Sequence, residues 1–577
     1  LYNKSALLKT VSRRFGSNSR RAMRQPVRSY RRAIRLQPDT SVTVVHNLRT
    51  RNVRLKAFDR NGHQIALQSS PDGLNKLVIN TRADSVVNIE ITPIEDNQFS
   101  LKNNVRDYAM RLLMSPRHAT VRWRRMSGLS LPLFRNEIGN IFGQSQRYGA
   151  ISPGLGFAFG FISEDYVAKA KRRGWLVTDN GMSTPAIWST TDELNLELNL
   201  EPIRGLRVRM IMNRTDNRNS SIQFTSDNFQ PLRSGAFTMT SSAIATSLAT
   251  SSFKNGYKSS SFEKMLSNID EIEHRQLQRY HGLLYPSAGF LDDKPVSGKL
   301  FITEVSGFNK NSSDILIPAF VSAYTGIDVA KVTLNPFPKF NAVIPNWSIT
   351  YDGLSFIEPI RRLFKSVILN HAYQCTYSVG SYSSFPQWVE VGNNIGFIPS
   401  SDGVTPIPSS PYNIMSVAIS ERFAPLIGLK VVMHNNLSLN AEYRDRRTLT
   451  LNTAASQVVE ATQKGFSFGA GYKIVGLNLF YRHRKRQSSF SNDLTINGDF
   501  SFQNSQALVR RIETIYTQAT SGARTLTMNL AANYALSRLA TIGLFVDHQI
   551  NTPIVAMYSF PTTTTSYGLT VNLSLMR

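Results

Sequence analysis

The chain has 577 residues, a formal net charge of +27 and a pI near 10.2. Only 18% of the residues are charged, below the roughly 25% that is usual for soluble domains. The positive balance attracts polyanions such as nucleic acid, lipopolysaccharide or acidic protein segments. The single cysteine, Cys375, excludes a disulfide or a Cys-based metal site within the chain. No run of about 20 apolar residues is present, which excludes a transmembrane helix but not a barrel strand of about ten residues.

Residues 1–37 are predicted to form a basic arm. The first 35 residues contain eleven Lys and Arg and no acidic residue. Such an arm either binds a polyanion or a membrane surface, or is a solvated linker. The chain begins without an initiator methionine or a signal peptide, so we expect an exported form to be the C-terminal part of a longer protein.

Residues 38–95 are predicted to form a small soluble β unit. Short runs rich in β-branched residues, such as "SVTVVHNL" and "SVVNIEIT", are typical of strands. No catalytic pattern lies in this region.

Residues 96–249 and 341–577 show persistent alternation of apolar and polar residues, after a short helix expected at the start of the first region. In 155–161 Leu and Phe alternate with Gly and Ala, and in 194–200 Leu alternates with Asn and Glu. Period-two alternation predicts strands with one apolar face. We expect about 14 to 16 of them, each roughly 10–14 residues long, which exceeds the usual soluble strand.

The connections between these strands are predicted to alternate in length. Short turns are expected at 434–436, 473–476 and 536–539, and a long polar loop at 453–464. Alternating short turns and long loops are typical of an outer-membrane barrel whose short turns are periplasmic.

Residues 250–340 interrupt the strands with a predicted helical and irregular insertion. A helix is expected over 261–281, with Ser260 and Glu263 as a capping box, and a second from Pro318 to Gly326. A third candidate helix covers 355–366. The strand parity does not close across this block, so either a strand is hidden in it or one predicted strand lies outside the sheet.

We expect the apolar face of the strands to contact lipid and the polar face to line an aqueous lumen. A soluble β sandwich or propeller also buries one face, so alternation leaves that alternative open. Polar faces that carry charge, aromatic residues near strand ends and long strands favour a membrane. The residues expected to face lipid are Leu526, Met528, Leu530, Leu569, Val571 and Leu573. The basic residues expected to face the lumen, either as a positive field or in salt bridges with lumenal acids, are Arg122, Arg124, Arg207, Arg209 and Arg444.

No catalytic, metal or cofactor motif stands out. The segment "GLGFAFG" at 154–160 lacks the spacing of a nucleotide-binding loop and is read as part of a strand. His274 and His281 on the predicted helix are read as part of a solvated face and not as a metal site. We therefore predict no enzymatic activity, no metal and no cofactor.

Several long segments together resemble one family. They include "SPGLGFAFGF" at 152–161, "ILIPAFVSAYTG" at 315–326, "PNWSITYDGL" at 345–354 and "RFAPLIGLKVVMHNNLSLNAEYR" at 422–444. Their order along the chain resembles the C-terminal part of the Sov/SprA family, the outer-membrane translocons of the bacterial type 9 secretion system. The terminal Leu575-Met576-Arg577 departs from the terminal aromatic residue of many barrels.

The resemblance implies an outer-membrane location and a place in the wall of a barrel of about 36 strands. It also implies passage of folded cargo proteins with a C-terminal signal domain. The implied partners are the remaining N-terminal part of the translocon, a PorV-like shuttle barrel, a periplasmic plug protein, secreted cargo and outer-membrane lipid. The insertion at 250–340 would then lie at the barrel mouth or in the lumen. The alternatives are a self-contained porin for small solutes and a soluble basic protein that binds nucleic acid, a partner that we do not predict.

Overall fold

The structure is a computed structural model of the chain. It describes residues 29–36, 40–48, 53–59, 63–81, 85–93, 115–135, 137, 139–146, 151–178, 184–224, 231–247, 256–302, 308–339, 344–403, 405–477, 492–514, 516–537, 539–555 and 560–574. Most of the predicted basic arm and the helix expected at the start of 96–249 lie outside these residues. The chain forms two compact units, residues 1–116 with 202–204, and residues 117–201 with 205–577.

The first unit contains two small antiparallel sheets that share one core. One has the order β1-β7-β3-β4 and the other the order β2-β6-β5. Their bounds are β1 (Tyr30–Leu36), β2 (Thr40–Val45), β3 (Val53–Phe58), β4 (Gln64–Ile65), β5 (Gln68–Asp72), β6 (Lys76–Thr81) and β7 (Ser85–Pro93). The expected basic arm ends sooner than predicted, because β1 belongs to the sheet. Its Arg31 pairs with Glu90 on β7 at 2.6 Å, and Ile34 packs against the core.

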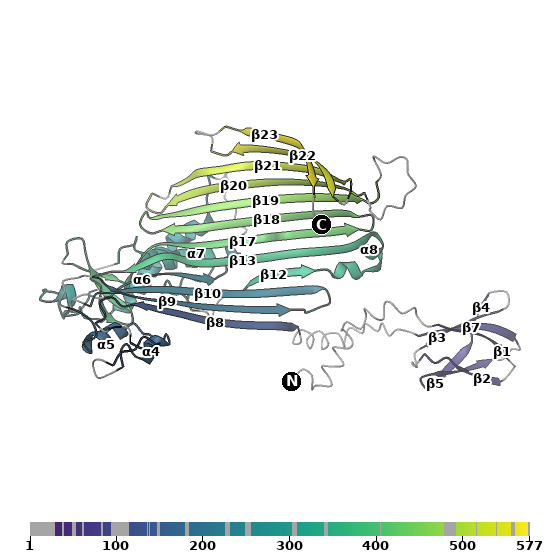
Figure 1. The fold of residues 1–577 in the computed structure, drawn as a ribbon, viewed down its shortest axis with the longest axis horizontal. Coiled ribbons are helices and arrows are strands. Elements are labelled where there is room, and N and C mark those ends of the chain that lie inside the picture. Colours follow the sequence, from purple (N-terminus) through teal and green to yellow (C-terminus); the bar gives the residue numbers. More distant parts are fainter. Residues whose placement is uncertain are drawn as a thin grey trace. The chain divides into compact units, whose positions relative to one another are not determined.

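The second unit is dominated by a 13-stranded antiparallel sheet (Figure 1). The strand order is β23-β22-β21-β20-β19-β18-β17-β13-β11-β10-β9-β8, with β12 pairing β10 and β13. The bounds are β8 (Pro116–Ser130), β9 (Ala186–Leu200), β10 (Leu206–Ile222), β11 (Leu232–Thr240), β12 (Asn346–Tyr351), β13 (Phe364–Ser384), β17 (Tyr412–Met433), β18 (Leu437–Asn452), β19 (Gln457–Ile474), β20 (Leu494–Arg511), β21 (Thr517–Ala535), β22 (Ala540–Pro553) and β23 (Thr562–Leu573). The predicted all-β class with a large antiparallel sheet is confirmed.

One position in this sheet is filled by two strands placed end to end. β11 pairs with residues 214–221 of β10, and β12 pairs with residues 206–211 of the same strand. Both also pair with β13. The chain between them, 241–345, therefore leaves the sheet halfway along a strand position and returns to the same position. This broken strand explains why the strand parity did not close across the insertion.

The inserted chain contains two helices that pack against each other, α6 (Ser260–Tyr280) and α7 (Ser313–Thr325), with the short η2 (Ile244–Thr246) and η4 (Gly289–Leu291). α6 begins one residue earlier than predicted, because the N-cap is Ser259, whose hydroxyl accepts the Phe262 amide at 3.3 Å, and not Ser260. α7 ends at Gly326 as predicted but starts well before Pro318. Proline has no N–H for the Asp314 carbonyl one turn earlier, and Gln276 of α6 donates to that carbonyl instead, at 3.0 Å.

Smaller elements complete the unit. A three-stranded sheet, β14 (Val389–Gly392), β15 (Ile395–Pro399) and β16 (Pro406–Ser409), lies between β13 and β17 in sequence. The third candidate helix, at 355–366, is observed as η6 (Gly353–Phe356) and α8 (Glu358–Leu363). The short α4 (Leu155–Ala158) and α5 (Tyr166–Arg172) follow β8.

Two local predictions need correction, and a third lies largely outside the described residues. The segment 155–161 is not a strand, because Gly154 and Gly160 take positive φ values of 97° and 77° and enclose the single turn α4. The loop expected at 453–464 is only a turn at 453–456, and β19 begins at Gln457 because Val458 is buried under the insertion. The strand expected from Leu477 onward falls largely outside the described residues. Within the described ranges the large sheet has 13 strands.

Candidate functional site

One face of the sheet carries a continuous apolar surface, here called the apolar belt. Cross-strand partners share a face, so the registers place its members in rows, such as Phe466, Phe502 and Leu526. The belt on the central strands consists of Phe466, Phe468, Ala470, Tyr472 and Ile474 of β19, Leu494, Ile496, Phe500 and Phe502 of β20, and Leu526, Met528, Leu530, Ala532 and Tyr534 of β21. It continues over Leu437, Leu439, Ala441 and Tyr443 of β18 and Ile542, Leu544 and Val546 of β22.

All six residues predicted to face lipid lie on the apolar belt or its continuation onto β23. Leu530 is 52% exposed and Leu569 is 63% exposed, although both are large and apolar. Leu544 pairs with Leu569, and Ile542 pairs with Val571, which joins β23 to the belt. An exposed apolar surface of this extent indicates contact with a membrane or another protein.

The height of the belt is close to that of the apolar band on a membrane barrel. Phe466 and Ile474 mark its two borders on β19 and are eight residues apart, about 27 Å at roughly 3.4 Å per residue. A tilt of roughly 40° reduces this to about 21 Å, close to the ~25 Å apolar band of outer-membrane barrels. The next row beyond Phe466 is polar, since Lys464 forms an ion pair with Asp445 at 3.3 Å. A charged row therefore closes one border of the belt.

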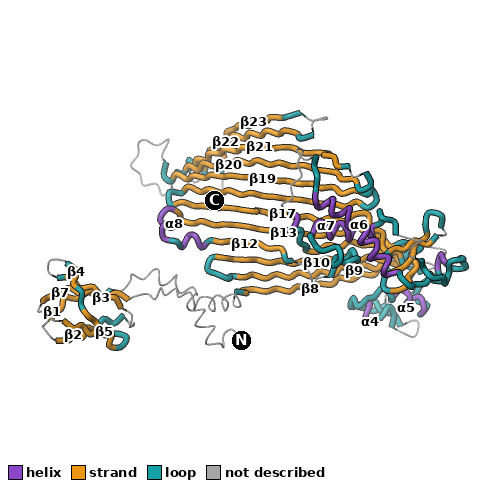
Figure 2. Tube along the Cα trace, turned by 180° about the vertical axis from the view of Figure 1, so that it is seen from behind, coloured by secondary structure: helices purple, strands orange, loops and turns teal. Residues whose placement is uncertain are grey.

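Beyond this charged row, the insertion covers the same face of the sheet. Helices α6 and α7 pack on Tyr377 of β13, Ile419 of β17 and Leu449 of β18, all of which share the face of the belt. Figure 2 shows both helices over one end of the strands. The insertion was expected at the barrel mouth or in the lumen. The structure places it over one end of the strands, on the face that carries the apolar belt, because its own core is apolar and matches that face.

Two sheet arginines fasten the insertion to the sheet. Arg447 pairs with Glu421 at 2.9 Å and donates to the Thr246 carbonyl of η2 at 2.8 Å. Arg510 pairs with Glu460 at 2.8 Å and donates to a backbone carbonyl of the insertion. All four charged side chains are buried. Each guanidinium is thus neutralised in the sheet while one of its other N–H groups binds inserted backbone.

Side chains also close the gap between β11 and β12. The Thr240 hydroxyl accepts the Asn213 amide at 2.9 Å, and the Asn346 side chain accepts the Cys375 amide at 2.7 Å. These amides belong to the two neighbouring strands and would otherwise lack a partner at the break. Buried backbone donors need such partners, so the break in the strand is stabilised without widening the sheet.

The opposite face of the sheet is mostly polar and carries the predicted lumenal arginines. The registers place Arg207, Arg209 and Arg444 there, and the Arg124–Glu193 contact places Arg122 and Arg124 there. Four of these five arginines have acidic partners. The distances are 3.8 Å for Arg124–Glu193, 3.3 Å for Arg207–Asp352, 2.9 Å for Arg209–Glu197 and 2.6 Å for Arg444–Glu442. Salt bridging, one of the two alternatives considered for these residues, therefore offsets much of their charge.

Sequence reasoning missed two arginines on this polar face, Arg422 of β17 and Arg446 of β18. They are cross-strand partners, and both are exposed. With Arg444 they line a cavity of about 300 Å³. The sequence shows the local cluster of basic residues around 444–447, but only the strand register reveals which arginines face each other.

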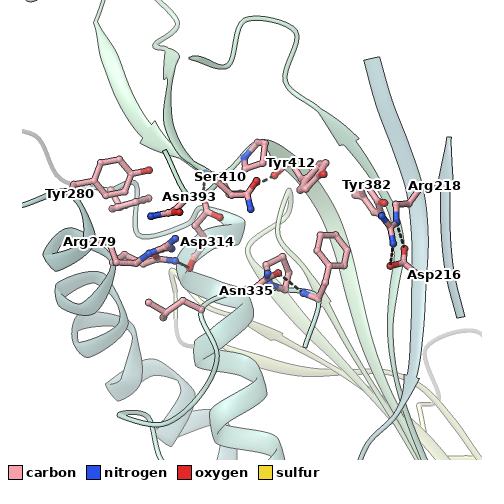
Figure 3. A pocket seen from close by; sticks show the side chains of 17 residues that line it. Asp216, Arg218, Arg279, Tyr280, Asp314, Asn335, Tyr382, Asn393, Ser410 and Tyr412 are labelled. Atoms are coloured by element: carbon pink, nitrogen blue, oxygen red, sulfur yellow. Dashed lines mark hydrogen bonds and ion pairs between the residues drawn. The ribbon is translucent and has the colours of Figure 1, made fainter. Parts of the chain in front are cut away.

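A second cavity, also of about 300 Å³, lies between the insertion and the sheet (Figure 3). Asp216 and Arg218 of β10 lie on one side of it, 3.0 Å apart. Tyr280 and Asp314 lie on the other side, where Asp314 accepts the Ser410 amide at 2.9 Å. Burial raises the pKa of the Asp314 carboxyl and of the Tyr280 hydroxyl. Aromatic rings and side-chain amides complete the lining of the cavity.

Within the described ranges, no group of three or more His, Cys, Asp or Glu side chains could hold a metal ion. No helix among the residues described is long and apolar enough to cross a membrane. The large sheet ends at β8 and β23, whose outer edges have no partner strand in the described part of the chain. Both edge strands expose apolar side chains, with Trp123 of β8 65% exposed and Tyr567 of β23 80% exposed.

Comparison with protein-family models and with curated proteins found no match. Among solved structures, the chain is similar to the beta domain of the Bordetella autotransporter BrkA, with 7% identity over 68% of this chain and 92% of that one, and a TM-score of 0.19. It is also similar to the outer membrane protein OmpT of Vibrio cholerae, with 9% identity, 66% and 91% coverage, and a TM-score of 0.17. The anion-selective porin from Comamonas acidovorans gives 9% identity, 67% and 91% coverage, and a TM-score of 0.10. Scores this low carry no argument, so the description of the fold rests on this chain's own sheet.

Proposed function

We propose that this chain forms part of the wall of an outer-membrane β-barrel. The apolar belt faces lipid and the opposite, polar face lines an aqueous lumen. The observation that carries this proposal is the belt itself, an exposed apolar band about 21 Å high that ends at the charged row of Asp445 and Lys464. Soluble sheets cover such a face with a second layer. Here the insertion covers only one end of it.

We further propose, on the resemblance to the Sov/SprA family, that the complete particle is the protein-conducting translocon of a type 9 secretion system. Folded cargo with a C-terminal signal domain would pass along the polar face to the cell surface. The two open edges at β8 and β23 favour additional wall strands from outside this chain. The N-terminal part of the translocon, a PorV-like shuttle barrel and a periplasmic plug protein are the proposed partners.

A self-contained porin for small solutes is the second candidate, and it requires β8 to pair with β23. Native purification in mild detergent, with identification of every chain and measurement of the particle mass, separates the two candidates. The translocon proposal expects a particle far larger than this 64.7 kDa chain together with other wall strands. A closed barrel made of this chain alone contradicts it.

Two adjacent residues of β19 test whether one face of the sheet contacts lipid and the other contacts water. Ser467 lies on the polar face and Phe468, 41% exposed, lies on the apolar belt. We expect a fluorophore on Phe468→Cys to be quenched by spin-labelled lipid, and one on Ser467→Cys to be quenched by aqueous iodide. The natural Cys375 is fully buried, so it contributes little background. Equal quenching of both positions by iodide would show a wall in water.

A further inference from the structure

The polar face contains an arginine cavity that the wall itself does not require. Arg422, Arg444 and Arg446 line it, with Gln463 and Gln503 beside them. Gly465 lies opposite Arg444 across β18 and β19, where it places no side chain in the space. The pairing of β17 with β18 skips residues 424–426, and this bulge lies next to Arg422. A glycine and a bulge thus open the sheet surface where three guanidinium groups gather.

The positive charges that line this cavity repel one another and lower the stability of the sheet. Arg422 and Arg446 are directly opposite each other on neighbouring strands, and like charges in such a pair are destabilising. Other arginines on the same face have carboxylates, as in the pairs of Arg207 with Asp352 and Arg209 with Glu197. Arg422 donates only to the amide oxygen of Gln374, at 2.6 Å.

The local acid cannot neutralise the cavity. Glu442 accepts from Arg444 at 2.6 Å and also lies 3.9 Å from Lys430. Among the described residues Arg446 has no hydrogen bond and no ion pair. The guanidinium groups of Arg422 and Arg446 are therefore uncompensated and exposed, and an anion bound between them would remove their mutual repulsion.

We propose that Arg422, Arg444 and Arg446 form a binding site for the carboxylates of an acidic peptide segment. Guanidinium groups bind carboxylates through paired, charge-assisted hydrogen bonds. The side-chain amides of Gln463 and Gln503 add donors and acceptors that suit the backbone of an extended peptide. The site rests on the proposed function, since it lies on the face that would line the lumen and would contact a protein within it.

The test uses the complete particle in detergent and a fluorescein-labelled octaglutamate peptide, with binding measured by anisotropy. The double variant R422Q/R446Q should bind about tenfold more weakly or worse, as expected when charge-assisted hydrogen bonds are removed. The matched control R207Q/R209Q removes the same charge from the same face, where both arginines already have acidic partners, and should change binding by less than about twofold. R422K/R446K should retain part of the binding, because charge is kept while the planar fork is lost.

Equal weakening by the two double variants would indicate a general positive field and overturn the site, as would no weakening by either. Inorganic phosphate that competes as well as the peptide at equal charge would overturn the assignment to a peptide. Co-purification of the other chains confirms that each variant is assembled. If iodide quenches the fluorophore on Ser467→Cys but the particle does not bind the peptide, the peptide site is refuted and the proposed wall is not. If spin-labelled lipid quenches that fluorophore, the proposed wall is refuted.

Discussion

Placing a charge at Leu530 tests the apolar belt at its centre. Leu530 lies midway between Leu526 and Tyr534, the two border residues of the belt on β21, and is 52% exposed. Its neighbour Asn529 points to the opposite face, across from Asp547 of β22. Leu530→Arg and Asn529→Arg therefore introduce the same side chain one residue apart, but into the two proposed solvents.

The expected cost of Leu530→Arg follows from its depth. An arginine on the lipid face at the bilayer midplane costs about 2–4 kcal/mol, which shifts the unfolding equilibrium by roughly 30-fold to 1,000-fold. Leu530 is about 14 Å from each border along the strand, at roughly 3.4 Å per residue, or about 10 Å along the membrane normal at a tilt of roughly 40°, so it lies at the middle of the belt. Asn529→Arg should be nearly neutral, because the new guanidinium gains the carboxylate of Asp547 in water.

The assay is urea unfolding of the wall in lipid vesicles, followed by tryptophan fluorescence, together with the amount of assembled particle in the membrane. We expect a clear loss of stability for Leu530→Arg and a change within about 0.5 kcal/mol for Asn529→Arg. Leu530→Ala is the control for lost packing. If the two arginine variants are equally stable, the belt does not face lipid and the proposed wall is refuted.

Three further predictions concern the insertion. Arg447→Met should destabilise its attachment by about 3–5 kcal/mol, because it leaves the buried Glu421 without its cationic partner and with only the Tyr373 hydroxyl as a donor, while Arg447→Met with Glu421→Leu should recover most of that loss in the same urea titration. Burial raises the pKa of Asp314 above its ordinary 3.8, so the contribution of this carboxyl to the stability of the insertion should be largest below that pH and should be lost as the pH rises through the raised pKa. Asp314→Asn should remove this dependence, measured as the pH profile of the denaturation midpoint, and an unchanged profile would contradict the assignment. Cys375 is fully buried, so it should resist maleimide in the native particle and react only on unfolding, as followed by mass spectrometry.

The broken strand gives the wall a feature that a simple meander lacks. β11 and β12 share one position, and the residues between them form α6, α7 and their connections. The side chains of Thr240 and Asn346 satisfy the backbone amides that face the break. A large insertion is thus carried from the middle of the wall without the loss of a strand position.

The alternation along each strand is a local property, and it was enough to predict the all-β class and the common face of Leu526, Met528 and Leu530. Side chains of a strand point to opposite faces with a period of two, whatever the neighbouring strands are. The ends of α6 and α7 were also partly predictable, because Gly326 and the serines before α6 act within one helical turn.

The placement of the insertion and the arginine cavity required the tertiary structure. Both depend on strand register, which pairs residues far apart in the chain, such as Arg422 with Arg446 and Glu421 with Arg447 on the opposite face. The local sequence pattern predicted a polar loop at 453–464. In the structure Val458 and Glu460 are buried and belong to β19, where the insertion covers the sheet. Long-range pairing thus decided which residues of the antiparallel sheet gather into sites.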